Sequence, residues 1–187
     1  MRRRVLPLDE LDFELCATSG QVFRFERFDR DGVQVWRGAD GSNVIEVERT
    51  PDGWVACSRP DPSAVERFLR LDVSLSDVSR RVVQLDPSFA SLVCRFPGLR
   101  TLRQARADET LFSFLCTVNN NLKRIQKLVR SLGRFGEELE PGVFEFPSPK
   151  RIAAIGEGRL REMGFGYRAQ TLVQVAEQLE RRPVRWV

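Results

Sequence analysis

The first sixty residues place hydrophobic side chains at alternate positions, with turn-forming residues between the runs. This alternation predicts strands with one buried face, and the intervening Asp-Gly and Ser-Gly pairs predict tight turns because glycine adopts positive φ readily. Strands are expected at residues 12–15, 21–28, 33–36, 44–47 and 54–57. Turns are expected at residues 19–20, 31–32, 40–41 and 52–53. The pattern therefore predicts an antiparallel meander.

From about residue 61 the hydrophobic spacing becomes that of amphipathic helices. Helices are expected near residues 63–71, 76–85, 88–95, 108–118, 122–133, 147–155 and 169–182, with a short one ending at Gly164. Asp108 is expected to cap a helix that is apolar nearly all round and therefore buried. From Asp108 onward the chain is predicted to be entirely helical. The fold class is thus α+β, with an antiparallel β-sheet domain with helices at residues 1–107 and a helical domain at 108–187.

The composition is that of an ordinary folded protein, with 42% hydrophobic and 30% charged residues in 187. The formal net charge of +4 permits a polyanionic partner without requiring one. The chain has no histidine, which excludes His-based triads and His metal sites. Its four cysteines are at least 22 positions apart, so no close pair suggests a zinc or iron–sulfur site. We expect no metal and no cofactor.

The first nine residues contain the basic run Arg2 to Arg4 but no apolar run behind it that would make a signal peptide. No stretch approaches the roughly 20 apolar residues of a membrane span. The scattered cysteines are typical of reduced thiols in a reducing compartment. The sequence therefore predicts a soluble intracellular protein with no membrane partner.

Three consecutive asparagines, Asn119 to Asn121, lie between two predicted helices, with Arg124 one turn further on. The triplet fits a helix–helix turn in which Asn121 caps the second helix. It also fits a recognition site, in which Asn119 and Arg124 project together and offer amide and guanidinium donors to a nucleobase edge. Taken alone, the triplet leaves both interpretations open.

Two glycine-containing turns also allow both a structural and a functional interpretation. Residues 164–169 place Tyr167, the only tyrosine, and Arg168 in a two-glycine turn at the mouth of a helix. A helix end followed by a buried tyrosine would explain this, and so would an aromatic that wedges into a base stack. Gly20 could be a simple hairpin entry, or a residue whose missing Cβ lets a backbone carbonyl approach a ligand closely.

An amine nucleophile would have to be Lys123, Lys127 or Lys150, the only lysines in the chain. All three fall on predicted solvated helix faces or ends, where a lysine is protonated at neutral pH and reacts poorly. We therefore assign no catalytic residue from the sequence.

Taken in order, residues 11–25, 112–125, 146–148 and 164–169 closely resemble the 8-oxoguanine DNA glycosylase family of base-excision repair. The resemblance extends over roughly residues 8 to 182, and the Asn triplet and the Gly-Tyr-Arg motif are specific in combination. It implies a helix-hairpin-helix glycosylase with AP-lyase activity. Its partner would be double-stranded DNA containing 8-oxoguanine opposite cytosine, in the nucleus or in a cytoplasmic nucleoid.

The resemblance also implies roles for individual residues. Asn119, Arg124 and Arg168 would hold the orphaned cytosine, Tyr167 would wedge into the stack, and Gly20 would present its carbonyl to the lesion. Oxidation at C8 turns N7 of guanine from an acceptor into an N–H donor, so a carbonyl there favours 8-oxoguanine over guanine.

In the family, the helix-hairpin-helix, the Schiff-base lysine and its assisting aspartate follow the position matched by Arg182, whereas this chain ends at Val187. We therefore expect a C-terminally truncated glycosylase with an incomplete helical domain. Such a chain would be inactive in excision on its own and would depend on a missing segment or a partner chain. The apolar stripe of its last helix should then be partly exposed, at Leu172, Val173, Ala176 and Leu179.

Two other functions remain open at this point. The first is a non-catalytic damaged-DNA-binding or interaction module that keeps the lesion or cytosine contacts without cleavage. The second is an alkyl-base glycosylase, which shares the architecture but is disfavoured by the Asn triplet and the Gly-Tyr-Arg motif.

Overall fold

The computed structural model describes residues 3–182, which form two compact units. The first unit contains the residues up to Gly38 together with Asn43–Arg103. The second contains Ala39–Ser42 together with the residues from Gln104 onward. Each unit has its own buried core and is described separately.

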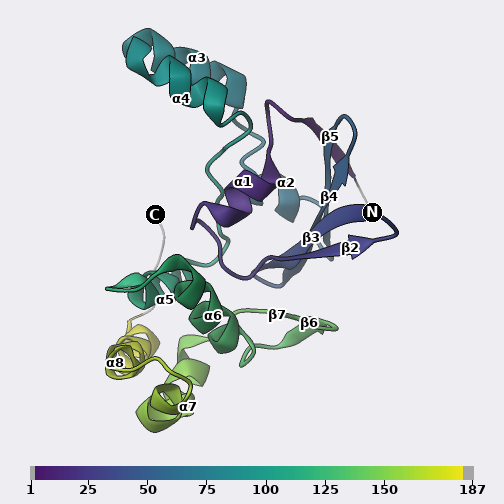
Figure 1. Cartoon of the computed structure of the whole chain (residues 1–187). Helices are drawn as coiled ribbons and strands as arrows, with labels where there is room; N and C mark the ends of the chain where they lie inside the picture. The colour runs from purple at the N-terminus through teal and green to yellow at the C-terminus, as the bar shows by residue number, and fades with distance from the viewer. Residues whose placement is uncertain (1–2, 183–187) are drawn as a thin grey trace. The chain divides into compact units, whose positions relative to one another are not determined.

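A five-stranded antiparallel sheet forms the centre of the first unit, with the strand order β1-β5-β4-β3-β2 (Figure 1). The strands are β1 (Arg4–Pro7), β2 (Glu26–Arg30), β3 (Val33–Asp40), β4 (Asn43–Thr50) and β5 (Gly53–Arg59). The last three confirm the predicted meander, and the α+β fold class is confirmed with them.

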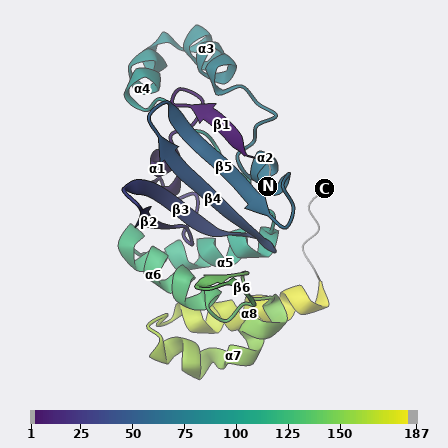
Figure 2. The ribbon, with the colours of Figure 1, turned by 90° about the vertical axis from the view of Figure 1, so that its right-hand side faces the viewer.

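Two short helices, α1 (Phe13–Thr18) and α2 (Ala64–Phe68), cover one face of this sheet (Figures 1 and 2). Phe13 and Trp54 pack edge to face, with ring centroids 6.3 Å apart. The register pairs Val47 with Ala56, which places both in the same core. Burying an aromatic or branched side chain here contributes about 1.5–3 kcal/mol each.

The opposite face of the sheet carries a charged cluster. Arg30 donates to both carboxylate oxygens of Glu46, at 2.8 and 2.9 Å, and Arg59 lies 3.8 Å from the same group. The bidentate hydrogen bond from Arg30 lowers the pKa of Glu46, against the opposing effect of burial.

Two sequence predictions for this unit were wrong in detail, and one strand was not predicted. Residues 12–15 are not a strand but the start of α1, because Asp12 accepts a hydrogen bond from the Leu15 backbone N–H and caps the helix. The strand expected from residue 21 begins only at Glu26. β1 was missed, since its burial alternates only weakly over four residues.

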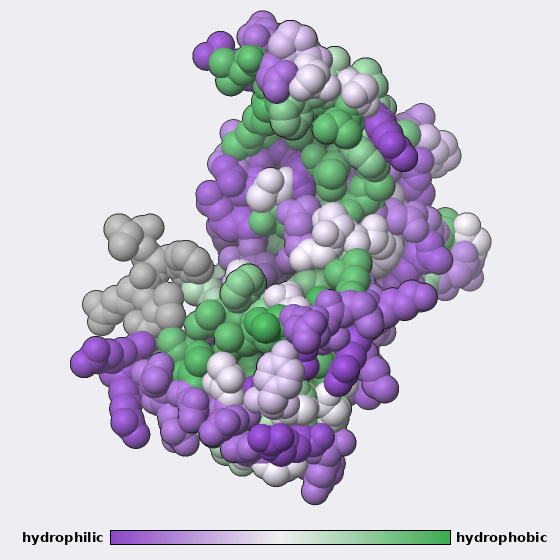
Figure 3. All heavy atoms as spheres, turned by 60° about the vertical axis from the view of Figure 1, so that its left-hand side comes forward, coloured by the Kyte–Doolittle hydropathy of each residue, from purple (hydrophilic) through white to green (hydrophobic). Residues whose placement is uncertain are grey.

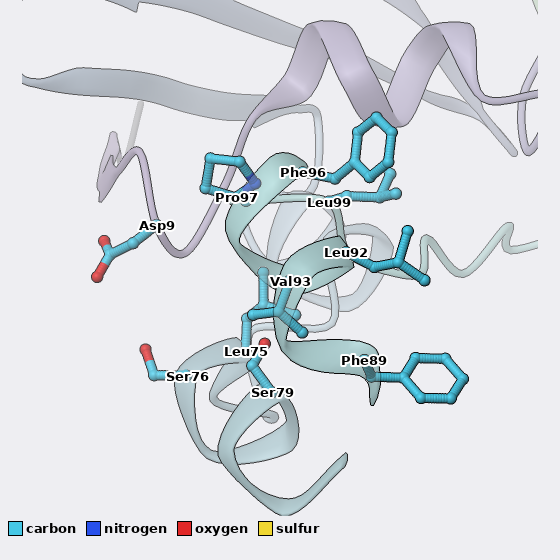
Figure 4. Close-up of a pocket in the computed structure, with 11 residues that line it drawn as sticks. Asp9, Leu75, Ser76, Ser79, Phe89, Leu92, Val93, Phe96, Pro97 and Leu99 are labelled. Carbon is cyan, nitrogen blue, oxygen red and sulfur yellow. The ribbon is translucent and has the colours of Figure 1, made fainter. Parts of the chain in front are cut away.

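A helical hairpin projects from this core, formed by α3 (Leu75–Leu85), a 3₁₀ turn (Pro87–Phe89) and α4 (Ala90–Arg95). These helices confirm the predicted helical spacing, yet none of their residues is buried. Beside them lies a groove of about 570 Å³ with a largely apolar lining (Figure 4). Apolar side chains gather on the surface here (Figure 3), including Val78, Leu85, Phe89, Leu92 and Phe96.

The second unit consists of helices around one small hairpin (Figure 2). Its elements are α5 (Ala107–Thr117), α6 (Leu122–Gly133), β6 (Glu138–Glu140), β7 (Val143–Phe144), α7 (Pro149–Glu162) and α8 (Arg168–Arg181). Fully buried side chains such as Phe112, Phe146 and Leu172 form its core. Gly156 interrupts α7 at φ +77°, so the two separate helices expected there are confirmed.

The expectation of an entirely helical second half was wrong. Residues 138–144 form the β6–β7 hairpin, turned by Gly142 at φ +78°. Asp108 does not cap α5, because it sits inside the first turn and pairs with Arg106, the actual cap residue. The helix is also not buried all round, since Phe114 is 64% exposed.

The apolar stripe of α8 is better covered than predicted. Leu172 and Ala176 are fully buried, because α7 packs along this helix, while Val173 and Leu179 are half-buried. Within the described residues, no helix combines the length and apolar character needed to cross a bilayer.

Candidate nucleic-acid interface

The three asparagines form the turn between α5 and α6, and each has a different structural role. Asn121 caps α6 by accepting a hydrogen bond from the Arg124 backbone N–H at 3.0 Å. Asn120 donates its side-chain amide to the Cys116 carbonyl at 3.0 Å and so closes the end of α5. Asn119 takes a left-handed conformation at φ +48°, which asparagine tolerates better than most residues. The predicted capping by Asn121 is therefore confirmed.

The Asn119 side chain is left exposed by this arrangement. Among the described residues, no hydrogen bond involves its amide group, whereas its two neighbours use theirs on the backbone. The turn therefore presents one amide donor and acceptor to solvent on a conformationally fixed backbone.

Arg168 holds this turn from the other motif. Its guanidinium donates from Nε to the Val118 carbonyl at 3.1 Å and from Nη2 to the Asn119 carbonyl at 3.0 Å, with a further Nη2 contact to Val118. The side chain is only 4% exposed. Hydrogen bonds from a buried charged donor to backbone carbonyls are strong, so Arg168 holds Asn119 in its left-handed conformation.

Arg124 makes the reciprocal contact. It lies on α6, immediately after the asparagine turn, and donates from Nη2 to the Gly164 carbonyl at 3.1 Å. Gly164 ends α7 at φ +92° and opens the Gly-Tyr-Arg turn. Each motif thus contributes an arginine that binds the backbone of the other, and the two turns form one site.

Tyr167 completes this surface. Its ring is 55% exposed, and its hydroxyl donates to the Val118 carbonyl at 3.3 Å. The Arg168 guanidinium lies 4.6 Å from the ring centroid, which fixes the ring by a cation–π contact. Of the two interpretations left open for this turn, the one with a buried tyrosine at a simple helix end is therefore wrong.

Cys116 lies beneath the same turn and is fully buried. Burial raises the pKa of its thiol to about 12, and the neighbouring Arg168 guanidinium opposes that rise only in part. The thiol is therefore a structural group under the turn and is kept in its neutral form.

Gly20 belongs to the first unit, whereas the other four predicted residues belong to the second. Its φ of +90° confirms that a glycine is needed at this turn. Gln21 anchors the turn by donating to the Arg100 carbonyl at 3.1 Å and accepting from the Leu102 N–H at 2.9 Å.

Two contributors to these sites were not predicted from the sequence, namely Gln21 and the Val118 carbonyl. The carbonyl receives hydrogen bonds from both Tyr167 and Arg168. A backbone acceptor leaves no signal in the residue type. Gln21 could have been noticed only as a polar residue amid an apolar alternation.

Residues 5–111 match the family described as 8-oxoguanine DNA glycosylase, N-terminal domain. The chain belongs to this family. It is 32% identical to the N-glycosylase/DNA lyase OGG1 of Arabidopsis thaliana, over 93% of this chain and 50% of that protein. It is 38% identical to the N-glycosylase/DNA lyase of Saccharomyces cerevisiae, over 79% of this chain and 40% of that protein.

A solved structure shares the fold of this glycosylase family member. The 8-oxoguanine glycosylase/lyase of Clostridium acetobutylicum, in complex with double-stranded DNA containing cytosine opposite 8-oxoguanine, has a TM-score of 0.79 at 21% identity. That match covers 94% of this chain and 61% of the Clostridium chain. The chain spans about half the length of the curated relatives it matches, or less.

Proposed function

We propose that this chain acts in base-excision DNA repair by recognising 8-oxoguanine opposite cytosine in double-stranded DNA. The reciprocal arginine contacts carry the proposal, because they join the two turns into one rigid surface. Family membership and the DNA complex of the Clostridium relative support it. A repair function of this kind belongs in the nucleus or nucleoid, where the DNA is.

Cytosine removed from its pair exposes two acceptors and an amino donor on its Watson–Crick edge. We propose that Asn119 and Arg124 supply donors to those acceptors. The Nε and Nη2 atoms of Arg168 donate to the asparagine turn. Its Nη1 is therefore the atom proposed to donate to the base. A good bidentate contact of this type is worth about 1–3 kcal/mol of discrimination against the wrong base.

Tyr167 and Gly20 are proposed to act on the stack and the lesion. The exposed tyrosine ring, held by Val118 and Arg168, is a rigid apolar wedge that can fill the space of an extruded base. The Gly20 carbonyl is proposed to accept a hydrogen bond from N7–H of 8-oxoguanine, a donor that guanine lacks. A site built on such a hydrogen bond rejects the analogue without it by about 10²-fold or more.

The curated relatives are named as glycosylases and DNA lyases. We propose that excision with strand cleavage needs an amine nucleophile that the lysines of this chain do not supply. Lys123, Lys127 and Lys150 are all exposed. An amine nucleophile needs a depressed pKa, which requires burial or a cationic neighbour in a water-excluded site. We therefore propose recognition, rather than chemistry, as the work of the residues described here.

The recognition proposal is tested by Arg124→Ala, with Arg151→Ala as control because it removes the same charge from an exposed position on α7. Affinities are measured for 8-oxoguanine duplexes with each of the four opposite bases. Arg124→Ala should cost about 1–3 kcal/mol opposite cytosine and reduce the preference for cytosine, whereas the control should do neither. Equal losses across all four opposite bases would instead indicate phosphate contacts.

The catalytic part is tested by borohydride reduction on an 8-oxoguanine duplex, which traps any Schiff base as a stable cross-link. We expect no efficient trapping. A cross-link that disappears on changing Lys123, Lys127 or Lys150 would show that one of these exposed amines is the nucleophile after all.

A further inference from the structure

Helix α6 carries an unusual concentration of positive charge. Residues 122–134 include Lys123, Arg124, Lys127, Arg130 and Arg134 and no carboxylate. Indeed, no acidic residue occurs between Glu109 and Glu137. These five charges exceed the formal net charge of the whole chain, which is +4. This helix and its cap residue are therefore strongly basic, whereas the rest of the chain sums to a formal net charge of −1 (4 − 5).

Three of the cations form a single exposed stripe. At 100° per residue, Lys123, Lys127 and Arg134 lie within about 40° of one another around the helix axis. The buried residues Leu128, Val129 and Leu132 lie on the opposite side. At 1.5 Å per residue the stripe is about 16 Å long, and all three side chains are exposed.

These three side chains lack the carboxylate partners that solvated helix faces usually provide. Within residues 3–182, no ion pair involves Lys123, Lys127 or Arg134. The last turns of α7 differ, since their exposed arginines pair with glutamates on the same helix, Arg161 with Glu157 at 2.7 Å and Arg159 with Glu162 at 2.9 Å. The last turns of α7 therefore balance their charges within the helix, whereas α6 contains no carboxylate that could do so.

The position of the cations also works against helix stability. Lys123 and Arg124 lie in the first turn of α6, which contains no acidic residue. The helix dipole makes this end positive, so cations here are unfavourable. Intrahelical stability therefore does not explain the arrangement, whereas an external polyanion would.

We propose that the Lys123–Lys127–Arg134 stripe binds the phosphate backbone of duplex DNA and supplies affinity without base selectivity. The orientation rests on the proposed function, because α6 begins at the asparagine turn, which is proposed to face the cytosine. Phosphates of one strand rise 3.4 Å per nucleotide, so a stripe of about 16 Å can follow several of them. Base-reading and phosphate-binding residues then share one helix.

The test uses the full chain and the double variant Lys123→Gln/Lys127→Gln, with Lys150→Gln/Arg151→Gln as the control that removes two exposed charges from α7. Dissociation constants for an undamaged duplex are measured between 50 and 200 mM salt, and circular dichroism confirms that the variants fold. Each phosphate contact contributes about −0.9 to the slope of log K against log salt, so the double variant should be shallower by about 1.8. The control slope should not change.

An unchanged slope in the double variant would overturn the proposal. The same variants are also compared on 8-oxoguanine and guanine duplexes, where the ratio of affinities should stay at the wild-type value. Loss of that ratio in the double variant would show that these lysines read bases, which contradicts the proposal. A wild-type chain that binds DNA with a steep slope but no preference for 8-oxoguanine would refute the proposed function and leave this inference standing.

Discussion

A comparison of Arg168→Ala with Arg124→Ala should separate the contribution of these arginines to folding stability from their proposed contribution to DNA recognition. The side chain is 4% exposed and donates to the carbonyls of Val118 and Asn119. Hydrogen bonds from a charged donor contribute about 1.5–3 kcal/mol each, and the contact with the Tyr167 ring adds about 0.5–1 kcal/mol. Because both residues beside these carbonyls are exposed, water can replace part of the loss. We therefore expect the free energy of unfolding to fall by about 2–4 kcal/mol.

Stability is measured by urea unfolding of the full chain, monitored by circular dichroism. Binding is measured as the affinity for a duplex with 8-oxoguanine opposite cytosine. Arg124→Ala is the comparison, because Arg124 is exposed and its guanidinium donates to the Gly164 carbonyl at the protein surface. It should change stability by no more than about 0.5 kcal/mol while still weakening cytosine recognition. Arg168→Lys should recover only part of the loss, since an ammonium cannot reproduce the planar fork. If Arg168→Ala lowered affinity but left unfolding unchanged, the reasoning that this arginine holds the turn would be refuted.

Three further outcomes follow from the structure. Glu46→Gln should lower the free energy of unfolding, measured in urea, by about 1 kcal/mol at pH 7. This difference from wild type should shrink as the pH falls below 4.5, because a carboxylate whose pKa is lowered by folding loses its stabilising effect when it is protonated in the folded state. A difference that grew on acidification would contradict the sign. Gly98→Ala should lower thermal stability by about 3 kcal/mol or more, because its Cβ would lie 2.3 Å from backbone atoms, whereas Gly142→Ala, with open space, should cost about 1 kcal/mol. In thiol labelling at pH 8, Cys94 should react quickly and Cys116 only after unfolding; rapid labelling of both in the native chain would show that the second thiol is accessible.

The sheet strands that were predictable are the three longest strands of the sheet. β3, β4 and β5 are seven or eight residues long, which leaves room for period-two apolar pairs such as Val33 and Val35 in β3 or Ile45 and Val47 in β4 to be visible in the sequence. α1 is different, because a six-residue helix gives the two periods too few positions to be told apart, and the side-chain cap from Asp12 decides it. The β6–β7 hairpin has strands of three and two residues, too short for any periodic signal.

The residues of the candidate site could be proposed from the sequence, but their arrangement could not. The Asn triplet and the Gly-Tyr-Arg motif stand out as residue types at turns. Their mutual contacts depend on how α8 packs against α5, which no local pattern encodes. Nothing in the residue type of Arg168 distinguishes a guanidinium buried against backbone carbonyls from one that faces solvent.

The contact between Arg168 and the asparagine turn has a consequence for synthesis of the chain. Forty-nine residues separate Arg168 from Asn119. At translation rates of about 5–20 residues per second, that interval lasts roughly 2–10 s. During it, α5 and α6 leave the ribosome with a turn whose left-handed residue has no clamp. The nascent chain should therefore acquire the surface proposed to contact DNA in one late step, when α8 emerges and docks.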